Sequence, residues 1–259
     1  MADHTSPSRP AASELLHDLV SAALKAGADA AEAATSKRAS FAIGVRNGEL
    51  EDAEREESTD LGLRVFIGKQ QATVSASDLS EATRGRMVER AVAMARMSPE
   101  DPFASLAPKA LLAQGPHADL DLFDPTERSA DDLETAAIAA EQAAMAVQGV
   151  SRSEGGDASW STSEWQLVTS DGFVGTYRGS SFSVGAGVIA EKDGQMERGG
   201  QHRSRRHLED VPSPEEIGRE AGERAVARVG ACKIASTTAP VIFENRIATQ
   251  ILSPLLGAI

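Results

Sequence analysis

Histidine is the residue type in this chain best suited to hold a catalytic metal, and five are present: His4, His17, His117, His202 and His207. A zinc peptidase usually carries the pattern His-Glu-x-x-His on one helix, which places two metal ligands and a general base on the same face. No such spacing occurs here. His202 and His207 are five residues apart, which would direct them to opposite faces of a strand or about 140° apart on a helix. The histidines therefore predict no metal site.

The residues that could act as nucleophiles carry no recognisable pattern either. Cys232 is the only cysteine and has no histidine near it in the sequence, so we expect an incidental or buried thiol. A Gly-x-Ser-x-Gly elbow is absent, although a Ser-His-Asp arrangement of another kind stays open. Gly185-Ala186-Gly187 lies in an alternating segment and lacks the third glycine of a dinucleotide-binding fingerprint, so close packing explains it better. We predict no catalytic, cofactor-binding or metal-binding residue, and substrate-binding residues stay unassigned.

A basic cluster and an acidic run have both a structural and a functional interpretation. Arg203, Arg205 and Arg206 lie between His202 and His207. A solvated strand end or loop is the simpler interpretation, and a site for an acidic partner is the alternative. The acidic run consists of Glu49, Glu51, Asp52, Glu54, Glu56 and Glu57. A solvated edge strand explains this run, with a site for a cation or a cationic partner as the alternative.

Composition restricts the compartment and the partners. The formal net charge is −13, so the field of the protein would repel a phosphate backbone, and we expect no direct nucleic-acid binding. No apolar run approaches the roughly 20 residues of a membrane span, so no membrane association is expected. A single cysteine suits a reducing compartment. We therefore expect a cytoplasmic protein.

The hydrophobic pattern predicts an α+β fold in which antiparallel meander sheets with long hairpins pack against helices, in two successive α+β units. Helical spacing is seen over residues 12–26, 79–97 and 129–147, and a further helix begins at Ser213 as N-cap and ends near Gly230. Asp78 is the expected N-cap of the second helix. Asn47-Gly48, Asp171-Gly172 and Asp193-Gly194 are typical hairpin turns.

Five segments follow from this pattern. We expect a disordered tail over residues 1–10, a first α+β unit over 11–97 with about four strands, and a proline-rich connection over 98–125. A second α+β unit covers 126–232. Residues 236–259 begin with a short strand, Pro240–Phe243, and continue as a helix; we expect them to be the start of a truncated C-terminal domain. The two units share an element order but no residue-level repeat, so an old duplication and two unrelated units both stay open.

Several segments together resemble the TldD/PmbA family, and they occur in that family's order along most of the chain. They are residues 27–32 (GADAAE), 45–51 (VRNGELE), 61–70 (LGLRVFIGKQ), 225–230 followed by Cys232-Lys233-Ile234, and 239–245 (APVIFEN). The amino-acid sequences of the hairpins and of the last segment are similar to the PmbA/TldE type of subunit rather than the TldD type.

The resemblance implies a heterodimeric zinc metallopeptidase that degrades or processes unfolded peptides. In that arrangement a TldD-like subunit carries the zinc, and this chain is the non-metal partner with no cofactor of its own. The alternative is a regulatory or binding protein without proteolysis, of the DNA-gyrase-modulator type. A self-contained enzyme that uses unrecognised residues is a third hypothesis.

Overall fold

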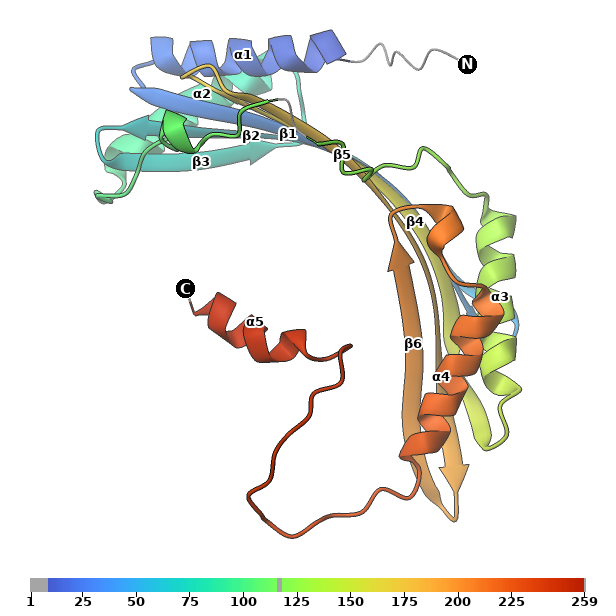
Figure 1. Ribbon diagram of the computed structural model, residues 1–259. Helices are drawn as coiled ribbons and strands as arrows, with labels where there is room; N and C mark the ends of the chain where they lie inside the picture. Colours follow the sequence, from blue (N-terminus) through green and yellow to red (C-terminus); the bar gives the residue numbers. More distant parts are fainter. Residues whose placement is uncertain (1–8, 116–117, 259) are drawn as a thin grey trace. The chain divides into compact units, whose positions relative to one another are not determined.

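The computed structural model describes residues 9–115 and 118–258, so most of the expected disordered tail and His4 and His117 lie outside the described residues. The chain forms two compact parts, one extending to Val229 and one from Gly230 onward. The first part holds the sheet and its helices (Figure 1). The second holds a single described helix, α5 (Thr249–Gly257).

A six-stranded sheet forms the first part, in the order β3-β2-β1-β4-β5-β6. Every neighbouring pair is antiparallel. The strands are β1 (Ala30–Arg46), β2 (Glu49–Ile67), β3 (Gln70–Ala76), β4 (Val150–Thr169), β5 (Val174–Lys192) and β6 (Gln195–Arg205). The predicted α+β class with long antiparallel hairpins is confirmed. The two expected meanders join into one sheet, because β1 pairs with β4 from Glu32↔Thr169 to Val45↔Gly156.

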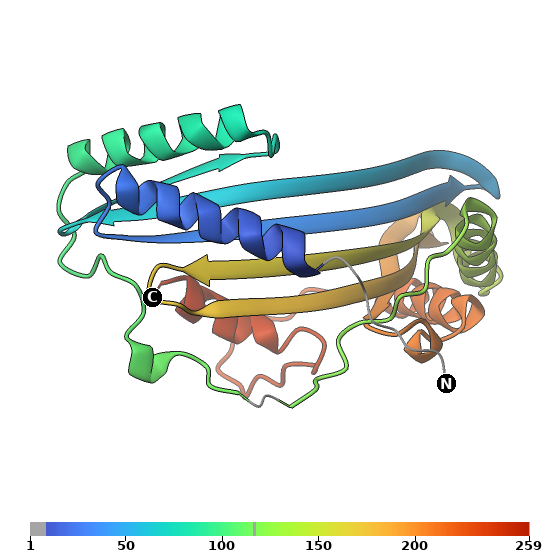
Figure 2. The ribbon, with the colours of Figure 1, turned by 90° about the horizontal axis from the view of Figure 1, so that it is seen from above.

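Four helices cover one face of this sheet: α1 (Arg9–Lys25), α2 (Glu81–Met97), α3 (Ala130–Met145) and α4 (Pro214–Arg228). The buried side chains of β1 show that both helix pairs lie on the same face of the sheet. Ala31 and Ala33 belong to the core under α1 and α2, whereas Ile43 and Val45 belong to the core under α3 and α4. All four positions are odd-numbered on one strand, so their side chains share a face. Figure 2 shows the two helix pairs over opposite ends of the long strands.

Two hydrophobic cores result. Leu16 of α1 and Val88 of α2 pack with Leu61 and Leu63 of β2 in the first core. The second core contains Leu133 of α3, Ile217 of α4, and Trp160 and Phe182 of the sheet. Glycine allows α3 and α4 to approach closely, because a Cβ on Gly218 would collide with the Ala140 carbonyl oxygen.

The turns and caps follow local rules with one exception. Asn47 and Gly48 have φ of 56° and 77°, as the predicted type I′ turn requires. Ser213 is the N-cap of α4 and accepts from the Glu216 backbone N–H at 3.2 Å, as predicted. The prediction for α2 was wrong, because Ser80 rather than Asp78 is its N-cap.

Asp78 has a different role just before α2. Its carboxylate accepts from the Ser80 backbone N–H at 2.9 Å and from the Thr83 hydroxyl at 2.5 Å. Hydrogen bonds from Thr83 and then Ser80 lower the pKa of Asp78 to about 2. The aspartate therefore supports the capping serine instead of replacing it.

Two predicted strands need correction. The first unit has three strands rather than about four, because residues 49–67 form a single strand in which Asp60 continues the ladder opposite Ser36. Pro240–Phe243 is not a strand. Among the described residues this segment has no partner strand, and an extended segment without a ladder is not a β-strand.

The proline-rich connection is held against the sheet near its end. Within it, the Leu122 carbonyl accepts from the Ser180 N–H at 3.0 Å, and the Asp124 N–H donates to Ser180 Oγ at 2.8 Å. The Asp124 carboxylate also accepts from the Leu208 N–H at 2.9 Å. Among the described residues of the connection, the only regular element is a 3₁₀ turn, η1 (Lys109–Leu111), and another 3₁₀ turn, η2 (Leu208–Asp210), follows β6. The predicted domain boundaries stay predictions.

Candidate functional site

The middle of the sheet face opposite the helices carries short, mostly polar side chains, whereas Trp165 and Tyr177 lie on the same face toward one end of the strands. Because β1 and β4 pair in register, even-numbered residues of β1 and odd-numbered residues of β4 point to this open face. Small side chains occupy the open face of four strands: Ser36, Ser40, Ala42, Gly44, Ser159, Ser161, Ser163, Ser181, Ser183, Gly185 and Ser204. Side chains this short leave the backbone of the sheet within reach of another molecule.

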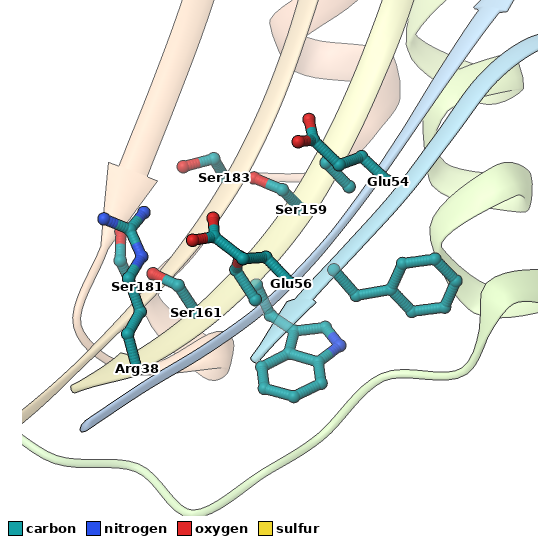
Figure 3. A pocket seen from close by; sticks show the side chains of 11 residues that line it. Arg38, Glu54, Glu56, Ser159, Ser161, Ser181 and Ser183 are labelled. Carbon is teal, nitrogen blue, oxygen red and sulfur yellow. The ribbon is translucent and has the colours of Figure 1, made fainter. Parts of the chain in front are cut away.

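A hollow of about 340 Å³ lies on the open face, across β2, β1, β4 and β5. Figure 3 shows Arg38 and the serine side chains of β4 and β5 toward the left of the view, with the glutamates Glu56 and Glu54 to the right. The hydroxyls of Ser40, Ser159, Ser161 and Ser183 form no hydrogen bond with any other described residue. A hydroxyl both donates and accepts, so this floor can bind the N–H and the C=O groups of a peptide.

The charged side chains of the hollow are also unengaged. Arg38, Glu54 and Glu56 form no ion pair within residues 9–115 and 118–258. All three are exposed. The hollow therefore offers one guanidinium, two carboxylates and several hydroxyls to a ligand.

An aspartate–histidine pair lies on the same face. Asp157 of β4 and His202 of β6 flank Gly185 of β5, and His202 Nδ1 is 3.6 Å from Asp157 Oδ2. A Cβ on Gly185 would lie 2.6 Å from Asp157 Oδ1 and 2.9 Å from His202 Nδ1. Because Gly185 has no side chain, the side chains of Asp157 and His202 can meet across it from two non-adjacent strands. Close packing at Gly185 therefore agrees with the structural interpretation of Gly185-Ala186-Gly187. The Asp157 carboxylate raises the pKa of His202, and partial burial opposes this shift.

The basic cluster does not converge on one site. Arg203 pairs with Glu220 of α4 at 2.8 Å, and Arg206 donates to the Ser180 carbonyl at 3.0 Å. His207 donates from Nε2 to the Asp121 carbonyl at 2.8 Å, and this hydrogen bond raises the pKa of His207. The Arg205 side chain donates to the carbonyl of its neighbour Ser204 at 2.9 Å. These residues have separate local partners at the end of β6, in agreement with the strand-end interpretation.

The acidic run lies on a free edge, as its sequence indicates. β3 pairs with β2 only from Leu61 to Ile67, so residues 49–60 of β2 have no strand on their outer side in the described structure. Residues 49–57 are all exposed. Glu54 and Glu56 border both this edge and the hollow.

The remaining sequence candidates do not contribute to this face. His17 is exposed on α1, where Nδ1 lies 2.7 Å from the Ser13 carbonyl oxygen. Cys232 is exposed in the second part of the chain. Among the described residues, no group of three or more His, Cys, Asp or Glu side chains could hold a metal ion. The residues described here therefore do not fit a zinc site.

Sequence reasoning missed one buried charged residue, Glu141 of α3, whose exposed fraction is 2%. Its carboxylate accepts from the backbone N–H groups of Asn47 and Gly48 at 2.7 and 2.8 Å, and from the Ser153 hydroxyl. A helix of the second half therefore binds the β1–β2 turn of the first half. The signal was present, because Glu141 falls within the apolar spacing of Ala137 and Ala144 on one helix face.

Comparison with known proteins places the chain in a family. Residues 31–95 match the description PmbA/TldA metallopeptidase domain 1, and residues 123–229 match the PmbA/TldA metallopeptidase central domain. Metalloprotease PmbA of Escherichia coli O157:H7 is 35% identical over 251 residues, which are 95% of this chain and 55% of that protein. The Metalloprotease PmbA homolog of Haemophilus influenzae is 32% identical over 93% of this chain and 53% of its own length. The chain thus spans about half the length of the relatives it matches.

Solved structures share the fold. A Bacteroides thetaiotaomicron protein named for modulation of DNA gyrase has a TM-score of 0.87 at 19% identity, over 95% of this chain and 56% of its own. TldE from Thermococcus kodakarensis has a TM-score of 0.68 at 18% identity, over 82% of this chain and 47% of its own. In the described part of this chain, no helix is both long and apolar enough to cross a membrane. From the matched domains and the sequence relatives, this chain belongs to the PmbA/TldD metallopeptidase family.

Proposed function

We propose that this chain is the non-metal, PmbA/TldE-type subunit of a heterodimeric zinc metallopeptidase that degrades or processes unfolded peptides. In this proposal a TldD-like partner subunit holds the zinc and breaks the peptide bond. This chain contributes a surface that receives the peptide. Membership of the metallopeptidase family supports the reaction class.

The observation that carries the proposal is the open face of the sheet. Free serine hydroxyls line a hollow there, next to a strand edge with unpaired backbone groups. Such groups bind a peptide through its main chain, so binding depends little on the side chains of the peptide. An unfolded peptide has free main-chain groups, whereas a folded protein has already used most of its own. A face of this kind therefore selects for unfolded chains.

The resemblance of the hairpins and of residues 239–245 to the PmbA/TldE type of subunit supports a division of labour between two subunits. The described residues include no cluster of three metal-binding side chains, and the open-face pair Asp157–His202 supplies only two. A zinc site that supports peptide hydrolysis needs three protein ligands and an open position for water. In this proposal the TldD-like partner subunit supplies the metal.

Reconstitution tests this function. The full chain and a zinc-bearing family member are purified separately and together, with metal content measured for each. We expect unfolded peptides to be cleaved only by the mixture, and stoichiometric zinc only in the partner. If this chain alone bound zinc stoichiometrically and cleaved peptides, the proposal would be wrong. If affinity capture recovered gyrase and no zinc-bearing subunit, a regulatory function without proteolysis would replace it.

A further inference from the structure

The outer edge of β2 between residues 49 and 60 is an unfilled position in the sheet. The other neighbour of this stretch is β1, which pairs with it from Glu49 to Asp60 except at a bulge at Glu51, so only one side is open. In an antiparallel strand, every second residue directs its N–H and C=O away from the existing neighbour. These groups are free to pair with one more strand. The edge is exposed and belongs to the part of the chain that contains the hollow.

Charge is distributed unequally between the two faces of this edge. On the open face, the carboxylates of Asp52, Glu54 and Glu56 have no ion-pair partner among the described residues. On the helix-side face, Glu57 is already neutralised by Arg55, whose Nη2 lies 2.9 Å from Glu57 Oε1. An added strand would therefore meet uncompensated negative charge on one of its faces only.

We propose that this edge binds an extended basic peptide by strand addition, with Lys or Arg at every second position directed to the open face. The inference rests on the proposed function, since it names the peptide class that this chain receives. Side chains of adjacent strands that face each other lie about 5 Å apart, so a lysine beside Glu54 or Glu56 can form an ion pair with it. Successive peptide side chains alternate between the faces, so basic residues are favoured only at alternate positions.

The same carboxylates discourage the competing occupant, a second copy of this chain. Two β2 edges placed side by side would bring Asp52, Glu54 and Glu56 of one copy close to the same acidic residues of the other. Like charges on facing strands are destabilising. The edge is therefore protected against self-association, as edge strands of natural proteins commonly are, while a basic strand is attracted.

Fluorescence anisotropy with labelled peptides tests the proposal on the full chain without any partner. The probes are an alternating Lys-Thr peptide, a peptide of identical composition with its lysines in one block, and the alternating peptide N-methylated throughout its backbone. We expect the alternating peptide to bind about tenfold more tightly than the block peptide. N-methylation should abolish binding, because it keeps the charge of the peptide but removes the backbone N–H groups that would pair with β2. Equal binding of the alternating and N-methylated peptides would overturn strand addition.

Matched variants on one strand locate the site. E54Q together with E56Q should weaken the alternating peptide about tenfold, whereas E57Q, on the opposite face, should leave affinity within about twofold. All three side chains are exposed, and circular dichroism checks that the variants fold. Unchanged affinity in the double variant would remove the edge assignment and leave the reconstitution test unaffected. Peptide binding with no cleavage by the reconstituted pair would instead reject the proposed function and retain the edge.

Discussion

At the scale of single residues, Glu141 connects the two halves of the sheet. Its buried carboxylate belongs to a helix of the second half and binds a turn of the first half. It accepts two backbone N–H groups of the β1–β2 turn and the Ser153 hydroxyl. A carboxylate that accepts several hydrogen bonds is well compensated for its burial. Its replacement leaves those part-buried donors weakly paired.

Glu141→Gln should therefore destabilise the protein by about 1–3 kcal/mol, since the amide can satisfy only part of this donor set. Urea denaturation of the two proteins measures the difference. Gln142→Ala, at the exposed neighbouring position on α3, is the control and should change stability by less than about 0.5 kcal/mol. Equal unfolding midpoints for Glu141→Gln and the parent chain would contradict the assigned role.

Asp78 predicts a pH dependence with a definite sign. Its pKa is about 2 in the folded protein because Thr83 and Ser80 donate to it, whereas an unfolded aspartate has a pKa of about 4. The stabilisation is present above the unfolded pKa and is lost as the pH falls from about 4 to 2. The parent chain should therefore be more stable than Asp78→Asn at pH 7, with a gap that shrinks below pH 4. Denaturation curves across this range check it, and a gap independent of pH would count against it.

At the scale of elements, α4 offers the simplest test of a sequence-predicted feature. Ser213→Ala removes the acceptor for the Glu216 N–H and should cost about 1 kcal/mol. Ser213→Asn keeps an acceptor at the cap and should restore most of the loss. Thermal unfolding of both variants gives the comparison, and equal losses in the two would show that capping is not the cause.

Helices and tight turns were predictable because their signals are local. Ser213 with Pro214, and Asn47 with Gly48, identify a helix start and a hairpin from a few adjacent residues. Gly27 and Gly149, with φ of 102° and 101°, each follow the first helix of their half, so the halves repeat in structure. The repeated order is helix, three strands, helix. The sequence predicted this repeat from the order of the elements, without a residue-level repeat.

The starts of the long strands were not predictable. Residues 30–40 of β1 are largely alanine, serine and charged residues, and no apolar alternation marks them as a strand. For residues 35–39 the reason is the gap between the two helix pairs, whereas Ala31 and Ala33 are buried under α1 and α2 and are simply small. Where no helix covers the sheet, neither face requires apolar side chains, and the period-two signal disappears. The open-face hollow was unpredictable for the same reason, because its serines come from strands whose pairing no local pattern reveals.

At the scale of the whole sheet, the two cores should unfold together. β1 and β4 run through both, and Glu141 of the second half binds a turn of the first. Leu63→Ala in the first core removes a fully buried side chain and should cost about 2–5 kcal/mol.

Trp160 lies in the second core, so its fluorescence in a Trp165→Phe background reports that core. In Leu63→Ala we expect the transition seen by Trp160 to shift to lower urea, together with the loss of helix measured by circular dichroism. Coincident transitions are the mark of cooperative unfolding. A Trp160 transition at the position of the parent chain would show that the two cores are independent.

The bare stretch in the middle of β1 has a consequence for motion. Residues 35–39 are exposed or half-buried and belong to neither fully buried core, so backbone hydrogen bonds are the main restraint there. Local opening requires the least free energy where few apolar contacts must be broken. Amide hydrogens of residues 35–39 should exchange with deuterium faster than those of 31–33 and 43–45 on the same strand. Such a strand is stiff near both ends and compliant between them, so bending of the sheet would concentrate in that stretch.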